Sequence, residues 1–296
     1  MSSPPPLAIV PPPLGSVPPS PPLSLASSPV SGASPPACPK LTIDHPKNDA
    51  ATCWWLAANF AIFHKDRPEM NTFISGSNEI AQQYSTISSY YKGEGGDKQT
   101  IIDARLNSTL VAHFSTAGFV LNKSGYEDVT EYTMKLNESL KIPYPDEGST
   151  QGFNQNPTSF NLYDIYLHKS SFTIPETSKT LLLSFPRAKQ GSTEPLDIPM
   201  KVLETIQVPV STLITPYTLD GIVAAQTGHY YSVVKCEGSD QWVEHGLKNI
   251  STATDARDID GTFVYENFST MIGDKVNGTY TRDIEKQATL LFYTRS

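Results

Sequence analysis

The strongest constraint on the fold is an almost uninterrupted run of apolar residues, Cys53-Trp-Trp-Leu-Ala-Ala-Asn-Phe-Ala-Ile-Phe63. This pattern favours a helix whose apolar side chains point in every direction rather than along one stripe. A helix of this kind is stable when other elements cover it on all sides. We therefore expect a buried helix that begins at the cysteine.

The pattern of the chain changes near residue 160. Before it, residues 77–140 favour helices, with the clearest pieces at 80–84 and 100–105. After it, short β-rich runs follow one another, separated by Gly, Pro and Asp. These runs are 179–185, 217–224, 229–235, 261–265 and 287–293. Helices followed by strands predict an α+β fold.

Residues 1–39 differ from the rest of the chain. They contain 14 of the 25 prolines and no Asp, Glu, Lys or Arg. Proline lacks a backbone donor and restricts φ, so this composition predicts a disordered tail ahead of a folded domain over residues 40–296. The tail is either a spacer or, through its PxxP spacings, a docking peptide for SH3 or WW-type domains.

Charge and cysteine content exclude several functions. The net charge of −8 argues against nucleic-acid binding, and the absence of a run of about 20 apolar residues argues against a membrane span. Three cysteines are too few for a disulfide framework, and no CxxC pair is present to hold zinc. We expect no metal or cofactor, no signal peptide, and a reduced location in the cytoplasm or nucleus. Six N-glycosylation sequons keep a secreted alternative open.

Cys53 and His229 are the candidate catalytic pair. The positive end of a helix dipole favours a thiolate, which is the nucleophilic form of cysteine. A nearby histidine would serve as its base. Of the six histidines, His229 follows a glycine and opens a β-rich run, so its ring would be held firmly. The alternative is that Cys53 is a small buried apolar residue without chemistry.

The segments around both residues resemble boxes of the ubiquitin-specific proteases. Asn48-Asp-Ala-Ala-Thr-Cys53-Trp is similar to the family's Cys box, and Gly228-His229-Tyr-Tyr-Ser-Val-Val-Lys235 is similar to its His box. Weaker resemblances follow in the family's order over 174–187, 196–199, 217–223 and 288–295. The resemblance covers about residues 44–296 and marks a divergent, minimal form, because the CxxC pairs of the family's zinc-binding fingers are absent.

This resemblance implies a papain-like cysteine protease fold with a helical thumb and an antiparallel β palm. It implies that Cys53 is the nucleophile, that His229 is the general base, and that Asn48 donates to the oxyanion. Tyr230 and Tyr231 match the aromatic wall around the C-terminal glycines of the substrate. For both tyrosines the alternative is ordinary strand packing.

The third catalytic position departs from the family. An Asp or Asn normally follows the Trp of the His box by four residues, but here Trp242 is followed in that position by Gly246. Glu244 or Asn249 would have to take the role after a shift in register.

Two functions therefore stay open. The resemblance implies a thiol-dependent isopeptidase that hydrolyses the bond after the C-terminal glycine of ubiquitin or a ubiquitin-like modifier. The departure at the third position favours a catalytically impaired relative that binds ubiquitin or serves as a scaffold.

Overall fold

A computed structural model describes residues 38, 52–121, 128–144, 160–161, 174–185, 199–226, 229–246, 262–275 and 282–295. The chain divides into two units, Met1–Pro35 and Pro36–Ser296, and all of these residues belong to the second. Except for Cys38, the expected proline-rich tail lies outside the described residues.

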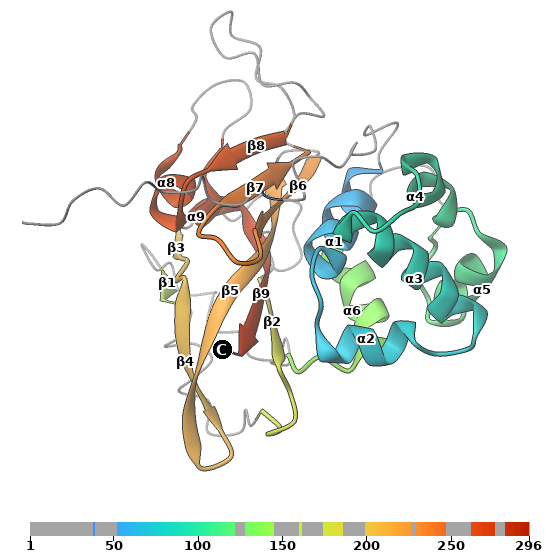
Figure 1. The fold of residues 1–296 in the computed structure, drawn as a ribbon, viewed down its shortest axis with the longest axis horizontal. Helices are drawn as coiled ribbons and strands as arrows, with labels where there is room; N and C mark the ends of the chain where they lie inside the picture. Colours follow the sequence, from blue (N-terminus) through green and yellow to red (C-terminus); the bar gives the residue numbers. More distant parts are fainter. Residues whose placement is uncertain are drawn as a thin grey trace, which may run out of the picture. The chain divides into compact units, whose positions relative to one another are not determined.

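The first part of the folded chain is helical (Figure 1). Its helices are α1 (Cys53–Phe63), α2 (Pro68–Ile74), α3 (Glu79–Lys92), α4 (Lys98–Ala104), α5 (Ser108–Thr116) and α6 (Val129–Leu140). Asn or Asp side chains accept hydrogen bonds from backbone N–H groups at the start of α3, α4, α5 and α6, which stabilises those helix ends. Within the described ranges, no helix combines the length and apolar character needed to cross a membrane.

The second part is built around a mainly antiparallel sheet. Its order among the described residues is β2-β9-β5-β6-β7-β8, and β4 pairs with the outer part of the long strand β5. The strands are β2 (Thr180–Ser184), β4 (Thr205–Val210), β5 (Leu213–Gln226), β6 (His229–Lys235), β7 (Trp242–His245), β8 (Thr262–Tyr265) and β9 (Ala288–Arg295). A short parallel pair, β1 (Phe160–Asn161) with β3 (Met200–Lys201), and the helices α8 (Phe268–Gly273) and α9 (Ile284–Gln287) complete it.

The predicted α+β order is confirmed, including the apolar helix and the strands expected over 179–185, 217–224, 229–235 and 287–293. Strand β4 was not predicted, and it contains Pro209, a residue type that is depleted in strands. Proline lacks a donor for the ladder and is tolerated at sheet edges. In β4 the prolyl residue is exposed, whereas Ile206 and Val208 are buried on the opposite face.

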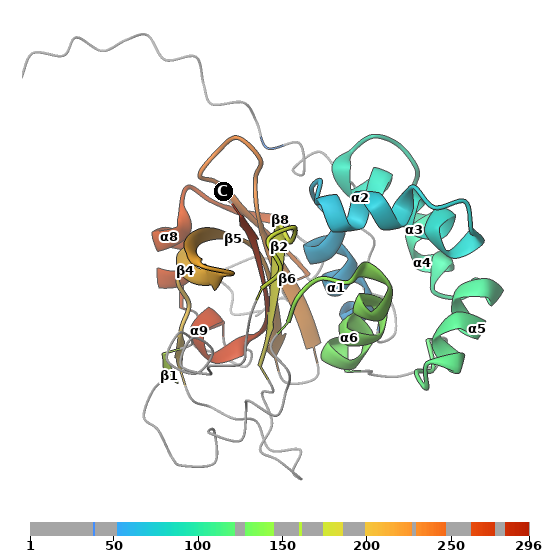
Figure 2. The ribbon, with the colours of Figure 1, turned by 90° about the horizontal axis from the view of Figure 1, so that it is seen from below.

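Helix α1 is buried along its whole length. It contacts β5 and β6 of the sheet on one side and the helices α3 and α6 on the other (Figures 1 and 2). The approach to β5 is so close that a Cβ atom on Gly221 would lie 3.0 Å from the carbonyl oxygen of Ala61. Glycine at this position therefore lets the helix lie against the sheet.

A buried ion cluster fixes the carboxyl end of α1. The guanidinium of Arg67 donates to the carbonyl oxygens of Ala61 and Ile62, which are among the last carbonyls of the helix, and pairs with Asp220 of β5. The ammonium of Lys65 lies 2.7 Å from the same carboxylate. Burial alone would raise the pKa of Asp220, but Arg67 and Lys65 outweigh it and hold this pKa below its ordinary value.

One disulfide joins Cys38 to Cys236, the residue that follows β6. Both cysteines are buried. The interpretation from the cysteine count did not anticipate this bond, because sequence spacing does not tell which cysteines meet when 198 positions separate them. Since such bonds are rare in reducing compartments, the cysteine content no longer supports the predicted cytoplasmic or nuclear location.

Replacing Asp220 by Asn should strongly destabilise the chain. The change leaves the buried Arg67 without its anionic partner, and loss of one member of a buried pair costs about 3–5 kcal/mol. Chemical denaturation measures the free energy of unfolding. The control is Asp240→Asn, whose carboxylate is exposed and lies 3.6 Å from Lys235. That change should cost less than about 1 kcal/mol, and equal effects of the two substitutions would contradict the role of the cluster.

Acid should remove the same stabilisation. Because the folded state lowers the pKa of Asp220, its contribution is complete above the ordinary value of 3.8 and declines as the pH falls through the lower, folded-state pKa. The difference in unfolding free energy between the wild-type chain and Asp220→Asn should therefore shrink in that acid range. A difference that grows on acidification would contradict the assignment.

Candidate functional site

Cys53 is the first residue of α1 and is 2% exposed. It remains a thiol, because the other two cysteines are bonded to each other. The residue before it, Thr52, is the N-cap, and its carbonyl oxygen accepts the first backbone hydrogen bond of the helix, from Leu56. The positive end of the helix dipole is therefore directed at the thiol, where it favours negative charge.

Two interactions, one at the start of α1 and one further along it, indicate that α1 runs parallel to β6. Tyr230, the second residue of β6, lies close enough to Cys53 for the two to interact electrostatically. Further along, the ring of Phe60 contacts that of His245, which pairs with Ser232. The first residue of α1 therefore lies at the end of β6 that begins with His229.

His229 is 3% exposed, and its ring is held by the strand next to it. The Nε2 atom donates a hydrogen bond to the carbonyl oxygen of Gly246, the residue that follows β7. A carbonyl oxygen only accepts, so in the neutral ring the proton sits on Nε2 and the lone pair on Nδ1. In this tautomer Nδ1 is the nitrogen that can take a proton from a thiol.

The hydrogen bonds described for Glu244 are made with residues other than His229. Its carboxylate lies 2.7 Å from Nε of Arg282 and accepts from the hydroxyl of Tyr265 at 3.0 Å. It pairs across the sheet with Val233, four positions beyond His229. Glu244 therefore neutralises a buried arginine.

The two tyrosines after His229 lie in different surroundings. Burial raises the pKa of Tyr230 to about 12, with smaller contributions from the charges of Asp128 and Cys53, so this side chain lies near both the thiol and the start of α6. Tyr231 is completely buried with the core residues of the sheet, and its hydroxyl donates to Gln287 at 2.7 Å. The surroundings of Tyr231 fit the strand-packing alternative.

Two predicted site residues, Asn48 and Asn249, lie outside the described residues. The sequence did not predict the hydrogen bond from His229 to Gly246. It did place Gly246 at the position where the related proteases have the Asp or Asn that orients the histidine. A backbone acceptor leaves no signal in residue type. The one indication in the sequence was the glycine itself, at the position of the third catalytic residue.

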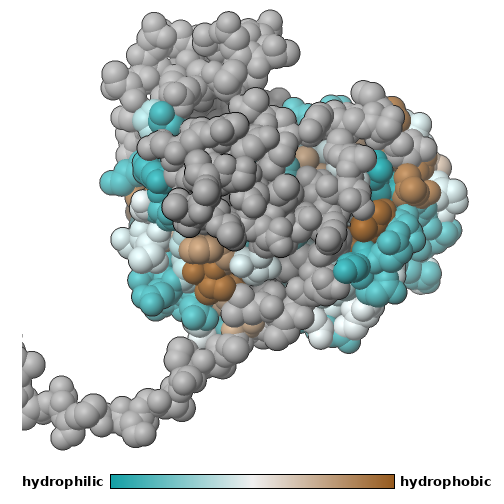
Figure 3. All heavy atoms as spheres, turned by 90° about the horizontal axis from the view of Figure 1, so that it is seen from above, coloured by the Kyte–Doolittle hydropathy of each residue, from teal (hydrophilic) through white to brown (hydrophobic). Residues whose placement is uncertain are grey.

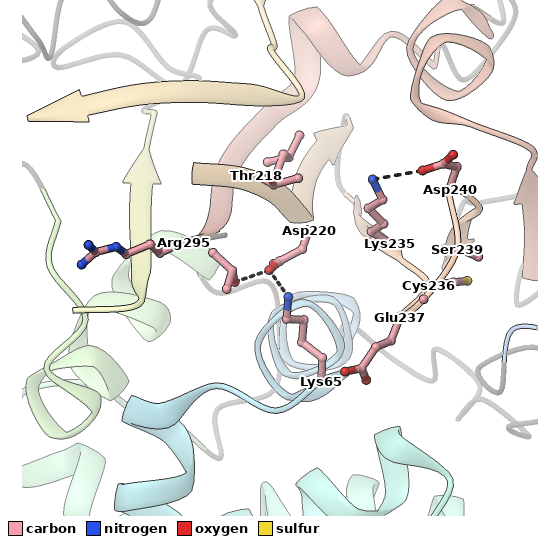
Figure 4. Close-up of a pocket in the computed structure, with 12 residues that line it drawn as sticks. Lys65, Thr218, Asp220, Lys235, Cys236, Glu237, Ser239, Asp240 and Arg295 are labelled. Carbon is pink, nitrogen blue, oxygen red and sulfur yellow. Dashed lines mark hydrogen bonds and ion pairs between the residues drawn. The ribbon is translucent and has the colours of Figure 1, made fainter. Parts of the chain in front are cut away.

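A hollow of about 460 Å³ lies at the other end of α1 (Figure 4). It is lined by charged groups of both signs, among them Lys65, Asp220, Lys235 and Asp240. Each of these four is held in an ion pair. No group of three or more His, Cys, Asp or Glu side chains suited to a metal ion occurs in the part of the chain that the structure describes.

The cysteine pairing should be visible in the mass of the chain after alkylation. Under denaturing conditions without reductant, we expect an excess of a small alkylating reagent to modify Cys53 alone, which adds one group to the chain. After reduction, all three cysteines should react. Intact-mass spectrometry counts the groups, and three groups before reduction would contradict the disulfide.

Known proteins resemble this chain in structure. No family model matches it, and no curated protein matches its sequence. The SAGA DUB module Ubp8/Sgf11/Sus1/Sgf73 bound to monoubiquitin has a TM-score of 0.51 at 16% identity, over 90% of this chain and 72% of that one. A yeast SAGA DUB module with variant Sgf73 gives 0.48 at 15%, over 90% and 69%. An essential yeast splicing factor gives 0.46 at 12%, over 87% and 70%. The first match shows a distant likeness to the fold of a ubiquitin-specific protease.

Proposed function

We propose that this chain is a thiol isopeptidase that hydrolyses the bond after the C-terminal glycine of ubiquitin or a ubiquitin-like modifier. The observation that carries the proposal is the placement of Cys53, at the amino end of a buried helix, beside the end of β6 at which His229 begins. His229 is in addition held in the tautomer that a general base for this thiol requires.

The reaction follows from these groups. Nδ1 of His229 takes the proton of Cys53, and the thiolate attacks the carbonyl carbon of the modifier's last glycine. The oxyanion that forms receives a hydrogen bond from the side-chain amide of Asn48, as the resemblance implies. Collapse of this intermediate breaks the isopeptide bond, and the protonated His229 gives its proton to the leaving lysine amine. Water then attacks the thioester, His229 accepts its proton, and the thiol is restored as the modifier leaves with a free carboxylate.

The fold is consistent with this role. In the proposal, the helices α1–α6 form the thumb and the sheet forms the palm of a papain-like protease, with the thiol on the first and the imidazole on the second. A structure of similar fold contains a deubiquitinase module bound to monoubiquitin. Ubiquitin conjugates are therefore the first substrate class to test.

The proposed contact with the modifier's tail is Tyr230, whose partly buried ring lies near Cys53. Elsewhere, the large exposed apolar side chains among the described residues are few, and on the coloured part of the face shown in Figure 3 the hydrophobic colour is limited to small patches. We therefore expect the tail in the catalytic groove to contribute more to recognition than an extended apolar surface.

A catalytically impaired relative that binds ubiquitin is the second candidate. The observation that favours it is the contact of His229 with a backbone carbonyl, where the family uses a side chain. A neutral carbonyl stabilises a protonated imidazole less than a carboxylate does. Turnover would then be slow or absent while the fold still binds the modifier.

The test is reaction with ubiquitin that carries a thiol-reactive electrophile at its C-terminus. We expect the wild-type chain to gain the mass of one ubiquitin and Cys53→Ala to gain none. His229→Ala should react about 10²–10⁴-fold more slowly, as is typical when a general base is removed. The matched control is His113→Ala, a partly exposed histidine on α5, which should react like the wild type.

A ubiquitin adduct that persists in Cys53→Ala would contradict the assigned nucleophile. If the wild-type chain binds ubiquitin but fails to react with this probe and with a panel of ubiquitin-like probes, the second candidate is correct.

A further inference from the structure

We propose that Gly246 is a positioning residue for His229, and that its backbone carbonyl replaces the side chain that orients the catalytic histidine in related proteases. The inference rests on the proposed function of the Cys53 and His229 pair. It assigns the third position of the site to a main-chain atom of Gly246, where the sequence had suggested the side chain of Glu244 or Asn249.

The sheet brings the two residues together. β6 and β7 are antiparallel, with Ser232 opposite His245. Continuing this register by one position places Gly246 opposite Tyr231, two residues from His229. The ring at the start of β6 reaches across to the carbonyl that follows β7, and Nε2 donates to it. Since His229 is 3% exposed, water has little access to compete for this hydrogen bond.

The backbone conformation of Gly246 sets the direction of this carbonyl. Its φ angle is +85°, in the left-handed region that glycine adopts most readily. Space is not the reason for glycine, because a Cβ atom there would make only ordinary contacts, the nearest at 3.8 Å from the carbonyl oxygen of Tyr230. A larger residue would favour a negative φ and turn the carbonyl away from His229.

Other groups near the ring have different partners. Glu244 is held by Arg282 and Tyr265. The ring of His245 lies against that of Phe60, with 6.0 Å between ring centroids. The carbonyl of Gly246 is therefore the acceptor that the described structure offers to Nε2.

This arrangement has a chemical consequence. A carbonyl fixes the Nε2–H tautomer and the ring plane as a carboxylate would, because both only accept hydrogen bonds. The carbonyl carries no full charge, so it stabilises the imidazolium less. The chain should have a correctly oriented base and a modest rate, without the near-complete inactivation expected for a misoriented ring.

The tautomer can be measured directly by long-range ¹H–¹⁵N correlation NMR on the full chain with ¹⁵N-labelled histidine, at a pH where His229 is neutral. We expect the Nε2–H tautomer in the wild type. In Gly246→Ala we expect a mixture of tautomers, together with a fall in kcat of about 10-fold, the equivalent of one hydrogen bond. KM should stay unchanged, since the glycine is not placed against the substrate.

The matched control is Gly238→Ala. Gly238 also has a positive φ, +71°, and a Cβ atom there would meet no atom within 4 Å. It lies in the turn between β6 and β7, away from the His229 end of β6. Its substitution strains the backbone in a similar way and should leave both the tautomer and kcat as in the wild type.

If Gly246→Ala does not fold, a second variant keeps the test decisive. Replacing the amide bond after Gly246 by an ester retains the glycine and weakens its carbonyl as an acceptor. This variant should shift His229 partly away from the Nε2–H tautomer. An Nδ1–H tautomer in the wild type, or a tautomer that no Gly246 variant changes, would overturn the proposal. If the expected tautomer and its loss are seen but the ubiquitin probe does not react, the positioning role stands and the proposed function fails.

Discussion

All eleven residues of α1 are buried, between the helices α3 and α6 and the strands β5 and β6. Such a helix has little freedom to slide, because each side is packed at close range and a Cβ atom on Gly221 of β5 would lie only 3.0 Å from the carbonyl oxygen of Ala61. The cluster of Arg67, Lys65 and Asp220 fixes its carboxyl end to the same strand. Since both the axis and one end are fixed, the position of the amino end and of Cys53 is fixed as well.

The two ends of α1 have opposite electrical roles. At the carboxyl end, the guanidinium of Arg67 donates to the carbonyls of Ala61 and Ile62 and offsets the negative end of the dipole, and Asp220 balances the added charge. At the amino end, Cys53 is the first helical residue and lies at the positive end of the dipole. The helix therefore serves both as the centre of the core and as the support of the nucleophile. Asp220 therefore stabilises the same helix that carries Cys53 at its other end.

The sequence was sufficient for the elements that burial patterns define. The apolar run over 53–63 predicted α1 because only a fully covered helix tolerates it, and β-branched runs predicted β5, β6 and β9. The two boxes predicted Cys53 and His229 as a catalytic pair, and this stays a prediction; Cys53 interacts electrostatically with Tyr230, the residue after His229. Three features were missed because they depend on long-range pairing: the Cys38–Cys236 bond, the pairing of Glu244 with Arg282, and the contact of His229 with a main-chain carbonyl. None of these leaves a signal in local composition.

The central claim is that Cys53 and His229 act as one unit, and the reactivity of the thiol tests it without any assumption about the modifier. The measurement is the rate at which a small alkylating reagent modifies Cys53 in the folded chain at neutral pH, in the wild type and in His229→Ala. The disulfide leaves Cys53 as the thiol that reacts, so intact mass reports on it alone. We expect alkylation to be at least about 10-fold slower in His229→Ala, because the base that generates the thiolate is gone. Equal rates in two equally stable proteins would show that Cys53 is an ordinary buried cysteine and would contradict the account.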